Sequence, residues 1–363
     1  MSLVRRIAIR PIVIALALAC VWLSTLTLGF AAETDLSVKV TSIPPLQRIR
    51  PDTDYARVTL QVLQHGQSLS AGHLEVNITS PGRTSWISTD FPMVEGTPLL
   101  SLASDLQDGM LTFDYLFPIR GVYQVDATVS PVPGGPDFPT TTLQQTLQLR
   151  ENPAEVRNVW ILIGGLLLLG GIGGALFARS ASAREALPSI ALLVVLIGLG
   201  MITPGSMADP DGQYVVQGEG GWVLDVRTTP THATVGQLLQ FDVMLSKDGA
   251  VFPEATQTTL LLHHVEDDKA VFETTTRAQT GASSQRFQFF DGAPHTVTIR
   301  AQPVDQDEVT PLQAVFEMEV EGLQPPMAVK IRTLFILIGV LAVGMAAGFF
   351  LLGSSKERGV ASV

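Results

Sequence analysis

Charge and cysteine are both scarce in this sequence. Only 16% of the 363 residues are charged, against about 25% in an ordinary soluble domain, and this deficit indicates membrane segments. The single cysteine, Cys20, excludes a disulfide framework and a cysteine-rich metal site. The net charge of -11 argues against a nucleic-acid-binding protein, which needs a basic face to neutralise phosphates.

Catalytic motifs are missing as well. The sequence has no Gly-x-Ser-x-Gly elbow, no His-Glu-x-x-His, no Walker loop and no Cys-x-x-Cys. Glycines cluster over residues 164–174, but they lie in an uncharged apolar run that no strand precedes and no phosphate could reach. We therefore predict that the protein is not an enzyme.

Four segments carry no charged residue over the roughly 20 residues that a helix needs to cross a membrane. They are Pro11–Ala32, Val159–Ala178, Leu187–Met207 and Thr333–Leu352. None contains Asp, Glu, Lys, Arg or His, so an ion pathway or a proton relay through these helices alone is not expected.

The first apolar segment follows Arg5, Arg6 and Arg10 and ends in the small residues Gly29-Phe-Ala-Ala32. This pattern predicts either a cleaved secretory signal or an uncleaved anchor. A lipoprotein signal at Cys20 is a weaker alternative, because Ala17 stands where leucine is usual and the apolar run continues beyond the cysteine. In each case the following residues leave the cytoplasm.

Basic residues set the expected orientation. The short segments 1–10, 179–186 and 353–363 hold seven Lys or Arg in 29 residues, whereas segments 33–158 and 208–330 hold 15 in 249. The positive-inside rule therefore places the short segments in the cytoplasm and both long segments outside, on a bacterial-type inner membrane or its equivalent. The long segments have net charges of -6 and -11.

The expected domain plan alternates helices with large outer domains. Its parts are a signal or anchor at 1–32, an outer domain at 33–158, a helix at 159–178, a cytoplasmic loop at 179–186, a helix at 187–207, an outer domain at 208–330, a helix at 331–352 and a tail at 353–363. The chain therefore repeats one unit twice, in which a helix is followed by an outer domain and a second helix.

Both outer segments show short alternating or β-branched runs separated by turn residues, the pattern of an immunoglobulin-like β-sandwich. The first segment predicts strands at 36–41, 55–64, 73–79, 110–117, 121–130 and 140–149. The second predicts strands at 222–229, 238–246, 258–264, 271–276, 285–290, 296–301 and 312–320. We expect all-β outer domains plus transmembrane α-helices.

The two segments also align with each other. Residues 36–40 match 222–226 in their alternation, and 114–125 match 287–297 with one gap, which places His295 opposite Tyr123. We interpret this as an internal duplication, the alternative being that any two sandwiches share such patterns.

Residues 288–299, QFFDGAPHTVTI, preceded by Gly249-Ala-Val-Phe-Pro253, resemble the small periplasmic sandwiches called FixH-like or YtkA-like. The resemblance covers about the 110 residues of the second outer domain. It implies a sandwich fold, membrane anchoring and an association with copper handling or cytochrome oxidase assembly. The doubled layout and the extra helices depart from that family.

A metal site is one functional hypothesis for the second domain. His232, His264 and His295, with Met244 on a neighbouring strand, supply imidazole and thioether, which suit copper or another heavy metal. His263 and His264 cannot both bind one ion from a regular strand, because successive side chains point to opposite faces. A structural role for His295, as a corner residue that hydrogen-bonds backbone, is the alternative.

The helices carry a second hypothesis. Gly170-x-x-x-Gly174 and Gly344-x-x-x-Gly348 allow close backbone approach between helices, and each pair begins 11 residues after the start of its span. We expect these helices to pack on each other or on a shared partner. The sequence thus favours an accessory or assembly subunit in the bilayer that holds an integral membrane partner or self-associates, with extracytoplasmic copper binding as the alternative.

Overall fold

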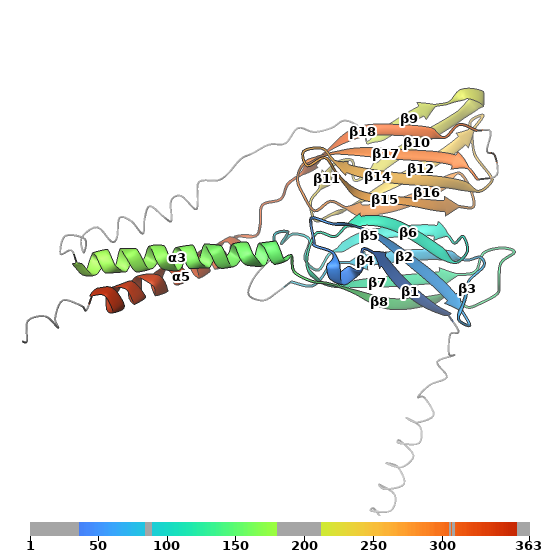
Figure 1. Cartoon of the computed structure of the whole chain (residues 1–363). Helices are drawn as coiled ribbons and strands as arrows, with labels where there is room; N and C mark the ends of the chain where they lie inside the picture. The colour runs from blue at the N-terminus through green and yellow to red at the C-terminus, as the bar shows by residue number, and fades with distance from the viewer. Residues whose placement is uncertain (1–35, 84–88, 180–211, 305, 307–308, 354–363) are drawn as a thin grey trace, which may run out of the picture.

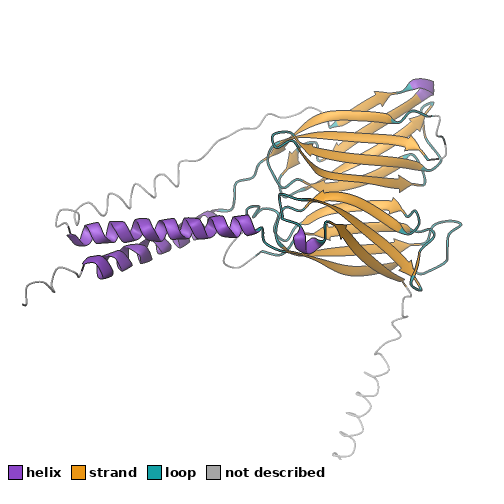
Figure 2. Cartoon of the chain, viewed as in Figure 1, coloured by secondary structure: helices purple, strands orange, loops and turns teal. Residues whose placement is uncertain are grey.

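The computed structural model describes residues 36–83, 89–179, 212–304, 306 and 309–353. A large β body is joined to two long helices, α3 and α5, that extend from one end of it (Figure 2). The predicted spans 11–32 and 187–207 and the loop 179–186 fall wholly or almost wholly outside the described residues. The all-β class expected for the two outer segments agrees with this architecture.

The first half of the body alternates buried and exposed residues along most of its strands, as half-buried strands should. These strands are β1 Leu36–Ile43, β2 Tyr55–Gln64, β3 Gln67–Ser68, β4 His73–Thr79, β5 Pro98–Asp105, β6 Met110–Leu116, β7 Gly121–Ser130 and β8 Thr141–Leu149, with the short 3-10 helix η1 Leu46–Arg48. Helix α3, Pro153–Arg179, follows directly.

The second half is built in the same way. Its strands are β9 Gln213–Gln217, β10 Trp222–Thr229, β11 Ala233–Thr234, β12 Leu238–Lys247, β13 Ala250–Val251, β14 Thr256–His264, β15 Lys269–Ala278, β16 Ala282–Gln288, β17 Pro294–Pro303 and β18 Leu312–Glu321, with the 3-10 helix η3 Glu219–Gly221. Helix α5, Met327–Gly353, ends the described chain.

Each of the two sheets contains strands from both halves. The first sheet runs β1-β2-β6-β15-β14-β17-β18-β11, and the second runs β8-β7-β4-β5-β16-β12-β10-β9. The two halves therefore share both sheets, so the two separate sandwiches expected from the sequence are one continuous double sandwich (Figure 1). Within each half the strand order is the same: β1-β2-β6 corresponds to β10-β12-β16, and β5-β4-β7-β8 corresponds to β15-β14-β17-β18.

We call the junction between the halves the seam. At the seam β6 pairs with β15 through Phe113–Thr274, Asp114–Glu273 and Tyr115–Phe272, and β5 pairs with β16 through Leu100–Phe287, Ser101–Arg286 and Leu102–Gln285. Side-chain hydrogen bonds cross it too, from Thr97 to Gln288 at 3.0 Å and from the backbone N–H of Arg277 to Ser104 at 3.0 Å. Both sheets thus continue from one half into the other.

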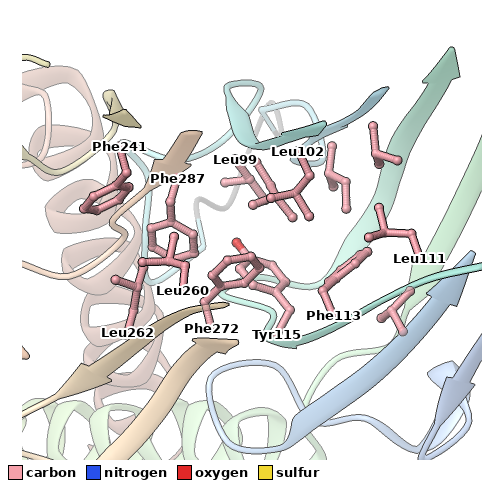
Figure 3. Packing of buried hydrophobic residues seen from close by; sticks show 14 of the residues in the cluster. Leu99, Leu102, Leu111, Phe113, Tyr115, Phe241, Leu260, Leu262, Phe272 and Phe287 are labelled. Atoms are coloured by element: carbon pink, nitrogen blue, oxygen red, sulfur yellow. The ribbon is translucent and has the colours of Figure 1, made fainter. Parts of the chain in front are cut away.

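An aromatic cluster fills the space between the sheets at the seam (Figure 3). The ring of Tyr115 lies 6.2 Å from that of Phe272 and 6.1 Å from that of Phe287, and all three residues are fully buried. Buried residues of both halves form a single hydrophobic cluster. The seam is therefore part of the core and not a surface between two finished domains.

Helix α3 begins six residues before the apolar run expected from the sequence. Asn152 caps it: its side-chain oxygen accepts a hydrogen bond from the N–H of Ala154 at 3.0 Å, and its amide donates to Glu155 at 3.0 Å. Pro153 occupies the first helical position, where its missing N–H costs nothing. Helices α3 and α5 are both long and apolar enough to cross a membrane.

Candidate functional site

The structure brings together two of the proposed metal ligands, His264 and His295. They face each other across β14 and β17, with ring centroids 4.9 Å apart. Both residues are buried, His295 being 2% exposed and His264 6%. As the alternation of strand residues requires, His263 points to the other face, where its Nε2 lies 3.3 Å from Asp268.

Hydrogen bonds at these two rings decide which nitrogens carry protons. The backbone N–H of Asp267 donates to Nδ1 of His264 at 3.1 Å, so Nδ1 has no proton and the neutral ring carries its proton on Nε2. That Nε2 is buried and makes no hydrogen bond to the described residues; a carboxylate oxygen of Asp291 lies 3.5 Å from it, without hydrogen-bond geometry. A metal ligand needs a free lone pair, so this proton opposes metal binding by His264.

His295 has the opposite arrangement. Its Nδ1 lies 2.8 Å from the carbonyl oxygen of Ala293, which only accepts, so Nδ1 is the donor and Nε2 keeps the lone pair. Burial lowers the pKa of His295 to about 4, and the ring is therefore neutral at neutral pH. This pair accordingly offers one available imidazole nitrogen, that of His295.

The other two proposed ligands lie elsewhere. His232 is exposed in the connection between β10 and β11. Met244 lies on β12 in the second sheet, where its buried neighbours Val243 and Leu245 face the core and Met244 faces outward. His264 points inward from the first sheet, so the full thickness of the sandwich separates the two. Among the described residues, no three His, Cys, Asp or Glu side chains form a group that could hold a metal ion.

The structural alternative for His295 has a clear counterpart in the first half. Tyr123, near the start of β7, is fully buried, accepts a hydrogen bond from the backbone N–H of Ile119 at 3.1 Å and donates to the carbonyl oxygen of the same residue. His295, near the start of the equivalent strand β17, bonds the carbonyl of Ala293. Each residue fixes the turn that leads into its strand.

The first half holds the remaining two histidines. His65 is exposed, in the turn between β2 and β3. His73 is half-buried, and its Nδ1 lies 2.8 Å from a carboxylate oxygen of Asp105. This hydrogen bond raises the pKa of His73.

The glycines of the two helices face each other. A methyl group on Gly170 would lie 2.9 Å from the amide nitrogen of Met345, and one on Gly344 would lie 2.5 Å from the carbonyl oxygen of Leu167. A methyl on Gly174 would collide with the carbonyl of Met345, and one on Gly348 with that of Gly171. Backbones that meet so closely leave no room for any side chain.

Other glycines of the same helices are open. Ideal side-chain positions on Gly164, Gly165, Gly173 and Gly339 have no atom within 4 Å apart from the helix's own. Each of the four sequence-predicted packing glycines thus lies in the contact between α3 and α5, and the open glycines lie outside it. Near the ends of the pair, Phe177 and Phe349 also touch, with ring centroids 6.3 Å apart.

A feature that the sequence did not indicate is a cleft of about 530 Å³ at the seam, where β6 and β15 diverge beyond Phe113 and Thr274. Both halves line it, with Arg57, Asp114, Glu273 and Arg277 supplying charge of both signs. Arg57 binds Asp114 through two hydrogen bonds of 2.9 and 2.8 Å. No sequence signal marked this cleft, because strand pairing between the halves creates it.

No protein-family model matches the chain, and no curated protein matches it. The chain is similar at low level to solved structures. A conjugative transposon lipoprotein from Bacteroides eggerthii is 9% identical, the match spanning 27% of this chain and 96% of that chain, with a TM-score of 0.21. A DUF4426 family protein from Pseudomonas aeruginosa is 13% identical over 31% of this chain and 98% of that chain, with a TM-score of 0.22.

A third similar structure, alpha-2-macroglobulin from Salmonella, is 8% identical. The match spans 79% of this chain but 15% of that chain, with a TM-score of 0.22. TM-scores of this size assign neither a family nor a function. The similarity to FixH-like and YtkA-like domains therefore remains a resemblance in sequence, with no matching family model.

Proposed function

We propose that this chain is a non-catalytic accessory or assembly subunit of a membrane complex. In this proposal α3 and α5 cross the membrane, and the double sandwich stands on its extracytoplasmic side. The helices support a membrane location because large apolar side chains cover their surfaces: Trp160 is 67% exposed, Phe335 69% and Phe350 70%. Side chains of this kind are stable in lipid and costly in water.

The observation that carries the proposal is that the two halves are joined twice. They share both sheets and one core in the body, and their glycine faces meet between the helices. Because the halves are joined both in the body and between the helices, the chain forms a single unit, which is suited to holding another protein in a defined position. The equivalent strand orders support an internal duplication, in which each half consists of a sandwich followed by a helix.

The partner that we propose is an integral membrane protein. The experiment is to purify the tagged full chain in mild detergent and identify co-purified proteins by mass spectrometry. Recovery of one membrane protein in near-stoichiometric amount would support the accessory role. Recovery of the chain alone, as a monomer or a self-dimer, would contradict it.

Paired glycine variants test whether the partner needs the assembled helices. Replacing Gly170 and Gly344 with leucine separates α3 from α5 and should reduce the amount of partner recovered. The matched control replaces Gly164 and Gly339 with leucine, since these glycines lie in the same helices but have open space around them. Equal recovery with both pairs of replacements would show that the helix pair does not hold the partner.

Extracytoplasmic copper binding by the second half is the alternative. The proton on His264 Nε2 and the distance of Met244 leave His295 as its best ligand. Dialysis of the purified chain against copper tests it: about one equivalent bound, and lost in His295→Asn, would favour metal delivery over the accessory role. A protein that binds no copper after this dialysis would contradict copper binding by the second half.

A further inference from the structure

Buried polar side chains form the inner wall of the cleft at the seam. Thr274 and Thr276 of β15 and Ser104 of β5 line the cleft and are 2%, 1% and 4% exposed. Behind them Gln285 of β16 donates through Nε2 to the hydroxyl of Thr276 at 2.7 Å, and its carbonyl oxygen has no hydrogen-bond partner among the described residues. Buried polar groups cost free energy unless they are hydrogen-bonded, so this wall has capacity for a bound group.

The first half shows that the fold does not require this polar wall. When β7 and β17 are aligned at their corner residues, the strand registers place Thr274 at the position of Leu102 and Gln285 at the position of Phe113. Leu102 and Phe113 are fully buried and point into the core (Figure 3). Apolar packing is therefore possible at these positions, and polar residues there in the second half indicate a functional role for the wall.

Two strand edges face the cleft without pairing. β6 and β15 lie side by side (Figure 1) but pair over only three residues each, ending at Phe113 with Thr274. Thr112 and Thr275 are next in register, and the hydroxyl of each bonds a threonine of its own half, at 3.1 and 2.9 Å. The two strands thus hold to their own halves and leave the cleft open between them.

The backbone of Thr275 points into the cleft. Two residues further along β15, the N–H of Arg277 points away from β14 and donates to the hydroxyl of Ser104 at 3.0 Å. Because backbone groups alternate in direction along a strand, the N–H and C=O of Thr275 share this direction, and they have no backbone partner among the described residues. Such an edge binds an extended peptide through main-chain hydrogen bonds.

Charged side chains stand on both sides of Thr275. Glu273 is exposed and Arg277 is half-buried, and neither side chain makes a hydrogen bond or a salt bridge within the described part of the chain. The other two carboxylates of the cleft, Asp105 and Asp114, are already bound by basic side chains of the first half. The cleft therefore offers one negative group at its narrow end and one positive group at its wide end.

We propose that the cleft binds an extended peptide segment of another protein, which adds as a strand antiparallel to β15. Antiparallel pairing is the more stable direction per residue. This site lies on the β body and does not involve the helices, so it goes beyond the accessory role and is independent of it.

The register of the added strand determines its preferred residues. The residue opposite Thr275 is basic, because long side chains reach their diagonal neighbour on the next strand, here Glu273. The residue opposite Arg277 is acidic. The residue between these two points inward, because side chains alternate along a strand, and it meets the polar wall, so it is small and carries a hydroxyl.

The probe is the peptide Thr-Glu-Ser-Lys, acetylated and amidated at its ends and added to the purified full chain in mild detergent. A peptide this short should bind with a Kd on the order of 1 mM. At about ten times this concentration the amide hydrogen exchange of Thr275, measured by fragmentation mass spectrometry, should slow about tenfold. Unchanged exchange at Thr275 would mean that the cleft holds water only and would overturn the proposal.

Charge reversal tests the assignment of the acidic position. Arg277→Glu should weaken binding of Thr-Glu-Ser-Lys about fivefold, and Thr-Lys-Ser-Lys should restore it. The matched control is Arg300→Glu on β17, at an exposed position of the same sheet outside the cleft, which should bind the first peptide like the unaltered chain. Equal weakening in both variants would show that net charge alone governs binding, and would overturn the proposal.

The polar wall has its own test. Thr274→Leu introduces the residue that occupies the equivalent position of the first half, so the variant should fold. It should bind Thr-Glu-Val-Lys better than Thr-Glu-Ser-Lys, the reverse of the order expected for the unaltered chain, and an unchanged order would contradict the placement of the peptide against the wall. Peptide binding by a chain that co-purifies with no membrane protein would support this site and contradict only the accessory role.

Discussion

The two halves of this chain meet in two places, and the two contacts are built from opposite kinds of residue. At the seam large aromatic side chains fill the space between the sheets, with Phe272 and Phe287 5.2 Å apart between ring centroids. Between α3 and α5 the contact is made by glycines, which have no side chain. One contact buries apolar surface, and the other brings backbones together.

The different surroundings of the two contacts, water and lipid, account for the difference in their residues. In water the burial of apolar area stabilises an interface, at about 25 cal/mol per Å², so large rings are favoured at the seam. In lipid the surroundings are as apolar as a leucine, so burial gains little and close packing stabilises the contact instead. The contrast is what we expect if the seam lies in water and the helix pair in the membrane.

The largest predicted effect is at the seam. Phe272→Ala removes a fully buried ring that contacts Phe113, Tyr115 and Phe287, and should lower the free energy of unfolding by about 3–5 kcal/mol. Denaturant unfolding of the purified protein measures this loss. The control is Phe316→Ala, which removes a partly buried ring on β18 and should lower the free energy of unfolding by less. Equal losses in the two variants would show that the seam contributes no more to stability than a partly buried position.

The helix pair should be disrupted by a single added side chain. Gly174→Leu places a side chain on the backbone of Met345, which cannot move aside, and should cost about 1–3 kcal/mol of helix association. Thiol cross-linking between cysteines placed at Phe177 and Phe349 measures the association. Gly173→Leu, one residue away in open space, should cross-link normally; a loss there too would mean that the helix surface, and not the contact, is sensitive.

His295 should make the second half sensitive to acid. Its pKa is about 4 in the folded protein and near 6.5 when unfolded, so the unfolded chain binds a proton first as pH falls. Stability is therefore full above pH 6.5 and decreases by up to about 3 kcal/mol as pH falls to 4.

The replacement His295→Asn tests this pH dependence. It keeps a donor for Ala293 but cannot titrate, so the loss of stability between pH 6.5 and 4 should shrink. The control is His232→Asn, at an exposed histidine, which should leave the pH profile unchanged. An unchanged profile in both variants would contradict the assignment to His295.

The smallest predicted effect compares the two corner residues. Tyr123→Phe removes the hydroxyl that bonds the backbone of Ile119 and should cost about 1 kcal/mol at every pH below 9, because Tyr123 does not titrate there. The loss of stability in Tyr123→Phe should therefore be independent of pH, whereas the stability contributed by His295 depends on pH. A pH-dependent loss would mean that the two corners are not equivalent.

Most strands could be predicted because alternation and turn residues are local signals. Strands β2, β4, β7 and β10 have the bounds expected from the sequence. Strand β5 was missed because Leu99 and Leu100 are both buried, which breaks the alternation. Strand β5 forms one of the two strand pairs at the seam, the one with β16. Because β5 was not predicted, its pairing with the second half was not predicted either.

The candidate site was predictable only in part. The pairing of His264 with His295 needed the register of β14 and β17, and the protons on their rings needed the N–H of Asp267 and the carbonyl of Ala293. Met244 was proposed as a ligand because its strand was expected to be a neighbour, whereas β12 lies in the other sheet. Spacing along a chain does not report which sheet a strand joins.

By itself the sequence determined the class of each segment: apolar helices, alternating strands and glycines at helix-packing spacing. These properties follow from neighbours in the chain, within one turn of helix or one strand. Tertiary structure decided that the two sandwiches share one core and that the glycines of α3 meet those of α5. Such relations depend on edge pairing and close packing between residues more than 100 positions apart, for which the sequence carries no local signal.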